Sequence, residues 1–271
     1  MRELFPENKF LKKIESGSAP LGVFNYIKDV SMMEINAQAG LDFVIIDTEH
    51  GIMNIETVEN QITAALYAGL TPMVRLPEPI SYLFRKYMEM GARGILVPHV
   101  GSREECRYAQ QSLRYPPDGI AGACRSIHGV AYDPKNWMDY LDWVKDVSLI
   151  AMIEDQKGLD NLDEILDELK PGRDMIMFGK ADYGQSLGTL RRDGSPDPRV
   201  IEGYKRVIAR CKERNIGFIA CASTSPEGQK VEDVQTCVDD GCCAVVLNSD
   251  QFLYAESIRK ITMKCNDFKL S

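Results

Sequence analysis

The stretch DFVIIDTEHG, residues 42–51, places four consecutive hydrophobic residues directly before a group of polar ones. Phe43 to Ile46 predict a short strand buried on both faces, because strands of a parallel sheet covered by helices are apolar throughout. Asp47, Glu49 and His50 follow within the next four positions. Two carboxylates and one of only three histidines in the chain therefore stand at the end of a predicted core strand.

Seven further apolar runs of this kind occur along the chain, and segments of helical period separate them. The predicted strands cover residues 22–24, 43–46, 72–75, 94–97, 149–153, 175–179, 217–221 and 244–247. The clearest predicted helices cover residues 54–69, 102–113, 159–172 and 198–214. Eight strands alternating with helices predict an α/β fold, a (β/α)₈ TIM barrel. A doubly wound open sheet is the alternative, although no Gly-rich phosphate loop follows the first strand.

Length and composition indicate one soluble enzyme-sized domain. A chain of 271 residues matches a single barrel, and no repeat or linker divides it, so we expect residues 1–271 to form one domain. The net charge of −8 argues against nucleic-acid binding. We expect no membrane partner, because no stretch has the length of a signal peptide or a membrane span. The eight cysteines form no CxxC pair, which favours free thiols and a cytoplasmic location.

Polar residues gather where the predicted strands end, which is where a barrel carries its chemistry. Taken singly, each has a structural alternative: a carboxylate capping a helix, an arginine in a structural ion pair, or a histidine satisfied within a loop. Taken together they are expected at one barrel mouth. The residues are Asp47, Glu49, His50, Arg75, Glu154, Gly179, Lys180, Ala181 and Asp182.

These residue types suit the enolisation of a carbonyl compound. Glu154 and Asp182 come from neighbouring predicted strands, and with water they would make an octahedral site for Mg²⁺ or Mn²⁺. Arg75 could stabilise an oxyanion. His50, with its ring held by Asp47, could move protons near neutral pH. Metal, oxyanion clamp and base together indicate a metal-dependent aldol reaction.

Six sequence blocks occur in the order typical of a known family. They are DFVIIDTEHG, TPMVRLPEP, GARGILVPHV, RYPPDG, the glutamate of MIED, and GKADYGQSLG. From about Gly22 to about Ser257 the chain resembles the HpcH/HpaI class II pyruvate aldolases, which include 4-hydroxy-2-oxoheptanedioate aldolase and 2-keto-3-deoxy sugar-acid aldolases. The resemblance implies a barrel of the phosphoenolpyruvate/pyruvate superfamily type and a divalent metal (Mg²⁺, Mn²⁺ or Co²⁺). It also implies a homohexamer, a trimer of dimers, in which the C-terminal helix is exchanged between subunits.

The same resemblance implies a role for each matching residue. His50 matches the catalytic base, which Asp47 assists, and Arg75 matches the residue that steadies the enolate oxygen. The resemblance implies that Glu154 and Asp182 bind the metal, that Gly179, Ala181 and Asp182 bind the substrate, and that Glu49 supports the base. The implied reaction is reversible cleavage of a 4-hydroxy-2-oxo acid to pyruvate and an aldehyde.

Several positions depart from the family pattern and are candidates for substrate specificity: Lys180 for a proline, Met152 for a glutamine, His99 for a methionine, and His128 in the segment after RYPPDG. Lys180 is expected to face solvent or a second substrate carboxylate rather than form a Schiff base. For His99 we favour packing in the core over support of the site. A loop role for His128 is an equal alternative.

Two other functions stay open. The first is another reaction on the same enolate site, either oxaloacetate decarboxylation or condensation with a different electrophile. The second is a non-catalytic keto-acid-binding protein.

Overall fold

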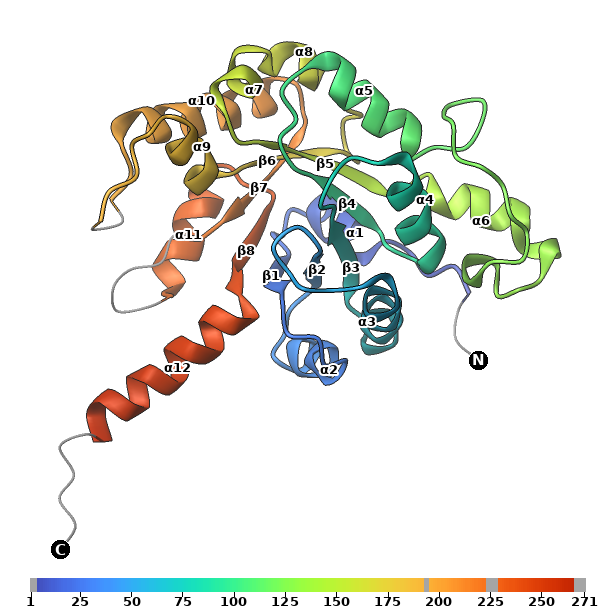
Figure 1. Ribbon diagram of the computed structural model, residues 1–271, viewed down its shortest axis with the longest axis horizontal. Coiled ribbons are helices and arrows are strands. Elements are labelled where there is room, and N and C mark those ends of the chain that lie inside the picture. The colour runs from blue at the N-terminus through green and yellow to red at the C-terminus, as the bar shows by residue number, and fades with distance from the viewer. Residues whose placement is uncertain (1–3, 193–194, 223–228, 266–271) are drawn as a thin grey trace, which may run out of the picture.

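Eight parallel strands close into a barrel in a computed structural model that describes residues 4–192, 195–222 and 229–265 (Figure 1). Each strand pairs with the next along the chain, and β8 returns to pair with β1. All eight predicted strands are confirmed, and with them the (β/α)₈ barrel. The strands are β1 Leu21–Asn25, β2 Phe43–Asp47, β3 Thr71–Arg75, β4 Gly94–Val97, β5 Ser148–Ile153, β6 Met175–Phe178, β7 Gly217–Cys221 and β8 Ala244–Ser249.

Helices surround this barrel (Figure 1). They are α1 Lys9–Glu15, α2 Ser31–Gln38, α3 Ile55–Ala68, α4 Ser81–Met90, α5 Arg103–Ser112, α6 Trp137–Val144, α7 Gln156–Asp160, α8 Leu162–Leu166, α9 Lys180–Ser186, α10 Pro198–Glu213, α11 Val231–Asp239 and α12 Asp250–Cys265, with short 3₁₀ turns η1 His128–Val130 and η2 Pro134–Asn136. The single helix predicted over 159–172 is wrong. The chain breaks at Asn161, whose side-chain amide donates to the carbonyl of Gly101 at 2.8 Å.

The strands alternate between an inner and an outer face, and this period of two sets the position of every strand-end residue. On β2, Phe43 and Ile45 pack inside the barrel, whereas Ile46 packs against the surrounding helices. Continuing the alternation turns Asp47 inward at the carboxyl end. By the same count Arg75 and Glu154 follow the inward-facing Met73 and Met152. Charged side chains therefore form a layer directly above an apolar barrel interior.

The opposite end of the barrel is closed by α1, a helix that the sequence pattern did not predict. Phe10 of α1 is buried and meets the ring of Phe43 edge-on, with ring centroids 5.0 Å apart. Phe10 also belongs to the same apolar cluster as the inward-facing strand residues. The barrel interior is thus a packed core. The charged residues of the predicted site lie at the end opposite α1.

The C-terminal helix α12 leaves the barrel rather than packing along it (Figure 1). Its large hydrophobic side chains Tyr254, Ile258, Ile261 and Met263 are exposed. Within the described ranges, no helix is long and apolar enough to cross a membrane.

Asp174, just before β6, ties together the amino-terminal end of the barrel. Its buried carboxylate accepts hydrogen bonds from the backbone N–H groups of Leu149 (3.0 Å) and Lys170 (2.9 Å), from the Arg173 guanidinium (2.8 Å) and from the Gln110 amide (2.6 Å). Burial by itself disfavours the charged form, but the bonds and charge of Arg173, with those of the backbone, outweigh it and lower the pKa of Asp174.

We therefore expect Asp174→Asn to lower the free energy of unfolding by about 3 kcal/mol at pH 7, because the partly buried Arg173 loses its countercharge. A carboxylate with a lowered folded-state pKa stabilises the fold above its unfolded pKa of about 4, and this contribution fades as pH falls through the folded-state pKa. Urea unfolding at pH 7 and at pH 3 should show the difference between variant and wild type shrinking at the lower pH. The exposed Asp142→Asn is the control, with an expected change below about 0.5 kcal/mol. A difference that stays constant with pH would contradict this assignment.

Candidate active site

A buried ion pair between Arg75 and Asp47 forms the centre of the barrel mouth. Nε of Arg75 donates to Oδ1 of Asp47 at 3.0 Å, and Nη2 donates to Oδ2. The exposed fractions of the two side chains are 7% and 0%, so neither charge is solvated by bulk water. Burial opposes the ionisation of Asp47, but the hydrogen bonds and charge of Arg75 outweigh it and lower its pKa. The pair therefore remains charged, with the ring of Phe24 at 4.8 Å from the guanidinium.

Asp47 also fixes the turn that carries His50. Oδ1 of Asp47 accepts hydrogen bonds from the backbone N–H groups of Glu49 (3.0 Å) and His50 (3.3 Å). Gly51 completes this turn, where a β-carbon would lie 2.1 Å from the carbonyl oxygen of Asp47, so only glycine fits. We expected Asp47 to hold the His50 imidazole, but its carboxylate contacts the backbone of the turn, Arg75 and Tyr26. The imidazole is 59% exposed.

Glu49 connects the arginine with both histidines of the mouth. Its Oε2 lies 3.1 Å from Nη1 of Arg75 and 3.8 Å from Nε2 of His50, and its Oε1 lies 3.6 Å from Nε2 of His99. Burial raises the pKa of this carboxyl, and the charge of Arg75 partly opposes the rise. Glu49 was expected to support the base, and it also lies close to Arg75 and His99.

Glu154 lies on the other side of the mouth, almost fully buried at 3% exposure. Its Oε2 accepts a hydrogen bond from the backbone N–H of His99 at 2.8 Å. Burial raises the pKa of Glu154, and the nearby carboxylates of Asp182 and Glu49 raise it further. The charge of Asp182 acts on Glu154, and a cation beside these two acidic groups is electrostatically favoured.

Our expectation that His99 packs in the core is wrong. The imidazole is 60% exposed, with Nδ1 at 3.4 Å from Oε2 of Glu154 and Nε2 near Glu49. The backbone of His99 adopts the left-handed region, with φ of 53°, which a non-glycine residue rarely occupies. In this conformation the backbone N–H of His99 donates to Glu154, and this hydrogen bond helps to hold the unusual backbone in place.

The loop between β6 and α9 passes directly against Glu154. A β-carbon on Gly179 would lie 2.7 Å from Oε1 of Glu154, so the absence of a side chain allows this close approach. The N–H of Gly179 donates to the carbonyl of Ile153 at 3.0 Å, which fixes the loop beside β5. Ala181 is exposed, and Asp182 lies in the first turn of α9. The sequence-predicted substrate loop therefore borders the acidic pair.

The donor set suits a hard divalent ion that keeps part of its water shell. Within residues 4–192, 195–222 and 229–265, no three histidine, cysteine, aspartate or glutamate side chains cluster as a metal site. Glu154 and Asp182 supply two carboxylates, and Mg²⁺ typically binds one or two carboxylates together with water and substrate oxygens. The missing β-carbon of Gly179 leaves space beside Glu154.

Two of the proposed specificity residues lie away from the open mouth. Met152 is buried inside the barrel below Glu154. Nζ of Lys180 lies 4.0 Å from the ring centroid of Tyr204 on α10, a cation–π contact rather than a solvent-facing position. Neither position provides a direct contact with the residues around Arg75.

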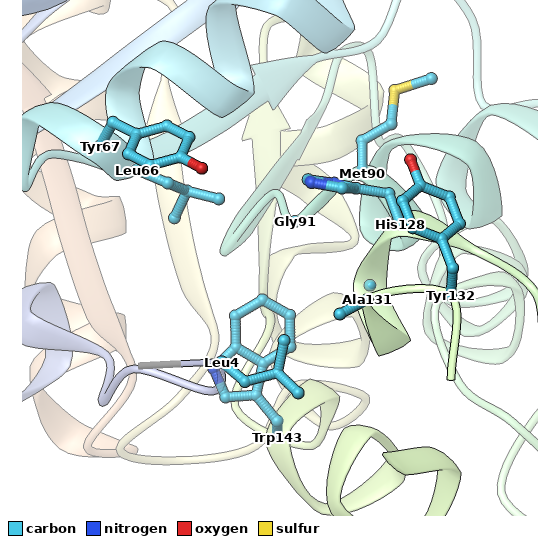
Figure 2. Close-up of a pocket in the computed structure, with 10 residues that line it drawn as sticks. Leu4, Leu66, Tyr67, Met90, Gly91, His128, Ala131, Tyr132 and Trp143 are labelled. Carbon is cyan, nitrogen blue, oxygen red and sulfur yellow. The ribbon is translucent and has the colours of Figure 1, made fainter. Parts of the chain in front are cut away.

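His128 lies in a separate pocket of about 310 Å³, at the ends of α3 and α4 that precede β3 and β4 (Figure 2). Figure 2 shows His128, Tyr132 and Trp143 around this hollow, with Leu66 and Met90 from the two helices. Helix ends of this kind lie at the amino-terminal ends of the strands, opposite the chemistry. His128 is therefore not brought together with the other predicted site residues.

One contact of the central ion pair was missed by sequence reasoning. The hydroxyl of Tyr26, one residue beyond β1, accepts a hydrogen bond from Nη2 of Arg75 at 3.3 Å. The period of two from Gly22 through Phe24 would have placed Tyr26 on the inner face. The apolar run predicted as a strand stopped at Phe24, and a neutral phenol carries no signal as strong as a carboxylate or histidine.

The fold and the site together define a (β/α)₈ barrel protein that carries a buried arginine, several carboxylates and an exposed imidazole at one end of its strands. Residues 21–255 match the family model described as HpcH/HpaI aldolase/citrate lyase, and the chain belongs to this family. The 2-keto-3-deoxy-L-rhamnonate aldolase of Escherichia coli (strain K12) is 30% identical over 256 residues, covering 93% of this chain and 90% of the relative. The chain is accordingly a class II pyruvate aldolase, a carbon–carbon lyase, and aldolases of this class generally depend on a divalent metal.

Solved structures have the same fold as this chain. The crystal structure of the citrate synthase SbnG is 29% identical and superimposes with a TM-score of 0.80, covering 98% of this chain and all of that one (100%). An HpcH/HpaI aldolase from Desulfitobacterium hafniense DCB-2 gives a TM-score of 0.85 at 24% identity, covering 95% of this chain and 96% of that one, and supports the fold alone.

We expect Gly179→Ala to displace Glu154, because the new methyl group would overlap its carboxylate. Crowding of this kind should lower the free energy of unfolding by about 1–3 kcal/mol. The control is Gly184→Ala in α9, where the nearest atoms to a β-carbon are 3.4 Å and 3.5 Å away and where alanine favours the helix. Urea unfolding of both variants and a crystal structure of Gly179→Ala check this expectation. An unmoved Glu154 with unchanged stability would refute the steric argument.

Proposed function

We propose that this protein reversibly cleaves a 4-hydroxy-2-oxo acid to pyruvate and an aldehyde, using His50 as the base and Arg75 as the oxyanion clamp. The observation that carries the proposal is the mouth itself. A buried, charged Arg75 lies beside Asp47 and Glu49, and an exposed imidazole follows on the same turn. The names of the aldolase relatives support a 2-keto-3-deoxy sugar acid, or a closely related hydroxy-keto acid, as the substrate class.

Glu154 and Asp182 are the residues that would hold the divalent metal, Mg²⁺, Mn²⁺ or Co²⁺. When bound, this ion supplies Lewis-acid polarisation of the substrate's keto oxygen. The backbone of the loop from Gly179 to Ala181 would bind the pyruvate carboxylate. These assignments follow the family resemblance, and the contact between Gly179 and Glu154 supports them.

The protein's own groups account for the proton transfers. In the cleavage direction, His50 accepts the proton of the C4 hydroxyl, the C3–C4 bond breaks and the aldehyde leaves. The electron pair of that bond passes into the pyruvate enolate, whose oxygen faces Arg75. The carboxyl group of Glu49 lies 3.8 Å from the imidazole, next to the charge that this transfer creates. Protonation of the enolate carbon then yields pyruvate.

The enolate half of the reaction can be measured without knowing the aldehyde. Incubation with pyruvate and Mg²⁺ or Mn²⁺ in D₂O should exchange the methyl protons, which NMR follows as loss of the methyl signal. We expect chelation of the metal, His50→Ala and Asp182→Ala each to slow this exchange by at least about 10²-fold, the scale of general acid–base catalysis. Tyr108→Phe, a change on the exposed surface of α5, should leave the rate unchanged. Exchange that persists in His50→Ala would rule out this base.

A second candidate is condensation of the enolate with an electrophile other than an aldehyde. The likeness to a structure named as a citrate synthase, at 29% identity over nearly the whole chain, supports it. Oxaloacetate decarboxylation belongs to the same enolate chemistry. Carbon dioxide release from oxaloacetate alone would favour decarboxylation, whereas pyruvate and aldehyde release from a 4-hydroxy-2-oxo acid would favour the aldolase. Binding of keto acids without any proton exchange would instead indicate a non-catalytic binding protein.

We also propose that α12 packs against another subunit in a hexamer built as a trimer of dimers. The exposed Ile258, Ile261 and Met263 on a helix that leaves the barrel support this assembly. Eight free cysteines suit a cytoplasmic location, where thiols stay reduced.

Replacing Ile258 and Ile261 together by aspartate should reduce the assembly to a smaller species, because burying two carboxylates in an apolar interface is costly. Light scattering after size-exclusion chromatography gives the mass directly. Arg259→Glu, a charge change on the same exposed helix, is the comparison and should keep the wild-type mass. A wild-type chain that elutes as a monomer would count against the proposed assembly.

A further inference from the structure

Tyr26 touches both partners of the central ion pair. Its hydroxyl oxygen accepts a hydrogen bond from Nη2 of Arg75 at 3.3 Å, and its O–H donates to the carboxylate of Asp47. Burial raises the pKa of this phenol, and the bond to Asp47 raises it further, so the hydroxyl keeps its proton. One neutral group thus bridges the guanidinium and the carboxylate.

An inventory of the Arg75 donors shows what this bridge achieves. A guanidinium carries five N–H groups in a rigid plane. Nε and one hydrogen of Nη2 bind Asp47, and the second hydrogen of Nη2 binds Tyr26. Nη1 forms an ion pair with Oε2 of Glu49 at 3.1 Å, without a hydrogen bond between them. The planar group is therefore fixed along the edge that carries Nε and Nη2, and Nη1 is the nitrogen left to donate to a substrate oxygen.

The backbone around Tyr26 is in turn fixed by Asp250, the first residue of α12. Oδ1 and Oδ2 of Asp250 accept hydrogen bonds from the backbone N–H groups of Tyr26 (3.0 Å) and Ile27 (2.9 Å). The carbonyl of Ile27 accepts from the amides of Asn25 (3.0 Å) and Gln61 (2.8 Å). Asp250 is itself buried. A series of contacts thus leads from the start of α12 through the loop after β1 to Arg75.

We propose that Tyr26 is a positioning residue for Arg75, and that Asp250 determines where Tyr26 lies. The proposal rests on the function proposed above, in which Arg75 stabilises the enolate oxygen. It assigns a role in the reaction to a phenol in the loop after β1 and to the first residue of the helix that leaves the barrel.

The kinetic test compares two variants and their combination. We expect Tyr26→Phe to lower kcat for pyruvate proton exchange about tenfold with KM nearly unchanged, because a bond to a charged group that matters in the transition state is lost. Asp250→Asn should give a smaller decrease. The double variant should be no slower than Tyr26→Phe, since residues acting through one contact are not additive. Tyr115→Phe, which removes a hydroxyl 3.3 Å from that of Tyr140 and far from the mouth, should leave kcat unchanged.

A crystal structure of Tyr26→Phe beside the wild type separates this proposal from the proposed function. We expect the Arg75 guanidinium to rotate away from Asp47 or to occupy more than one orientation in the variant, whether or not the protein exchanges pyruvate protons. A wild type without exchange but with this displacement would reject the function and keep the positioning role. An unmoved guanidinium, or equal kcat for Tyr26→Phe and Tyr115→Phe, would overturn the proposal. If Tyr26→Phe fails to fold, Asp250→Asn is judged by the same two measurements.

Discussion

The buried ion pair between Asp47 and Arg75 is the interaction on which the barrel mouth depends. Taking a carboxylate and a guanidinium out of water costs several kcal/mol per ion, and the attraction between them repays this only when the geometry is good and further hydrogen bonds are satisfied. Here the guanidinium is bidentate on Asp47, and Tyr26, Glu49 and the backbone of the turn supply the other contacts. Removing either Asp47 or Arg75 would leave the charge of the other without its main partner in a low-dielectric site. The pair therefore connects the carboxyl ends of strands β2 and β3, and through Tyr26 the loop after β1, at the same time as it holds the proposed oxyanion clamp in place.

The residues that stabilise the barrel and the residues of the candidate site lie at different levels along the barrel axis. Its interior is a stack of apolar residues closed at one end by Phe10, and Asp174 ties the loops at that same end. The other end carries Asp47, Arg75 and Glu154, all on the inward face of their strands. Because the apolar layers provide the cohesion, the mouth can hold closely spaced charges and a strained backbone at His99 without loss of the fold.

Much of this arrangement could be predicted from local sequence. Continuous apolar runs such as Phe43–Ile46 predict buried strands because period and turn residues are local properties. The polar residues that directly follow these runs are likewise local features, and they predict which side chains lie at the mouth of the barrel. Contacts between distant segments are not encoded locally. The pairing of Asp47 with Arg75 rather than the His50 ring, and the contact of Lys180 with Tyr204, depend on packing across strands and helices. Tyr26 was missed because its neutral side chain gives no chemical signal until its neighbours are known.

The balance of charge at the mouth has a consequence for the order in which ligands arrive. Asp47 and Glu49 lie against the guanidinium of Arg75, and Glu154 and Asp182 add two further carboxyl groups to the mouth. Burial raises the pKa of both Glu49 and Glu154. A keto acid approaching this surface alone meets a net negative potential, whereas a cation is drawn toward it. With a divalent ion at the proposed metal site, binding should therefore be sequential: the cation would enter first and offset the negative charge, and the anionic substrate would follow. The negative potential at the mouth would then keep the affinity of the metal-free enzyme for keto acids low.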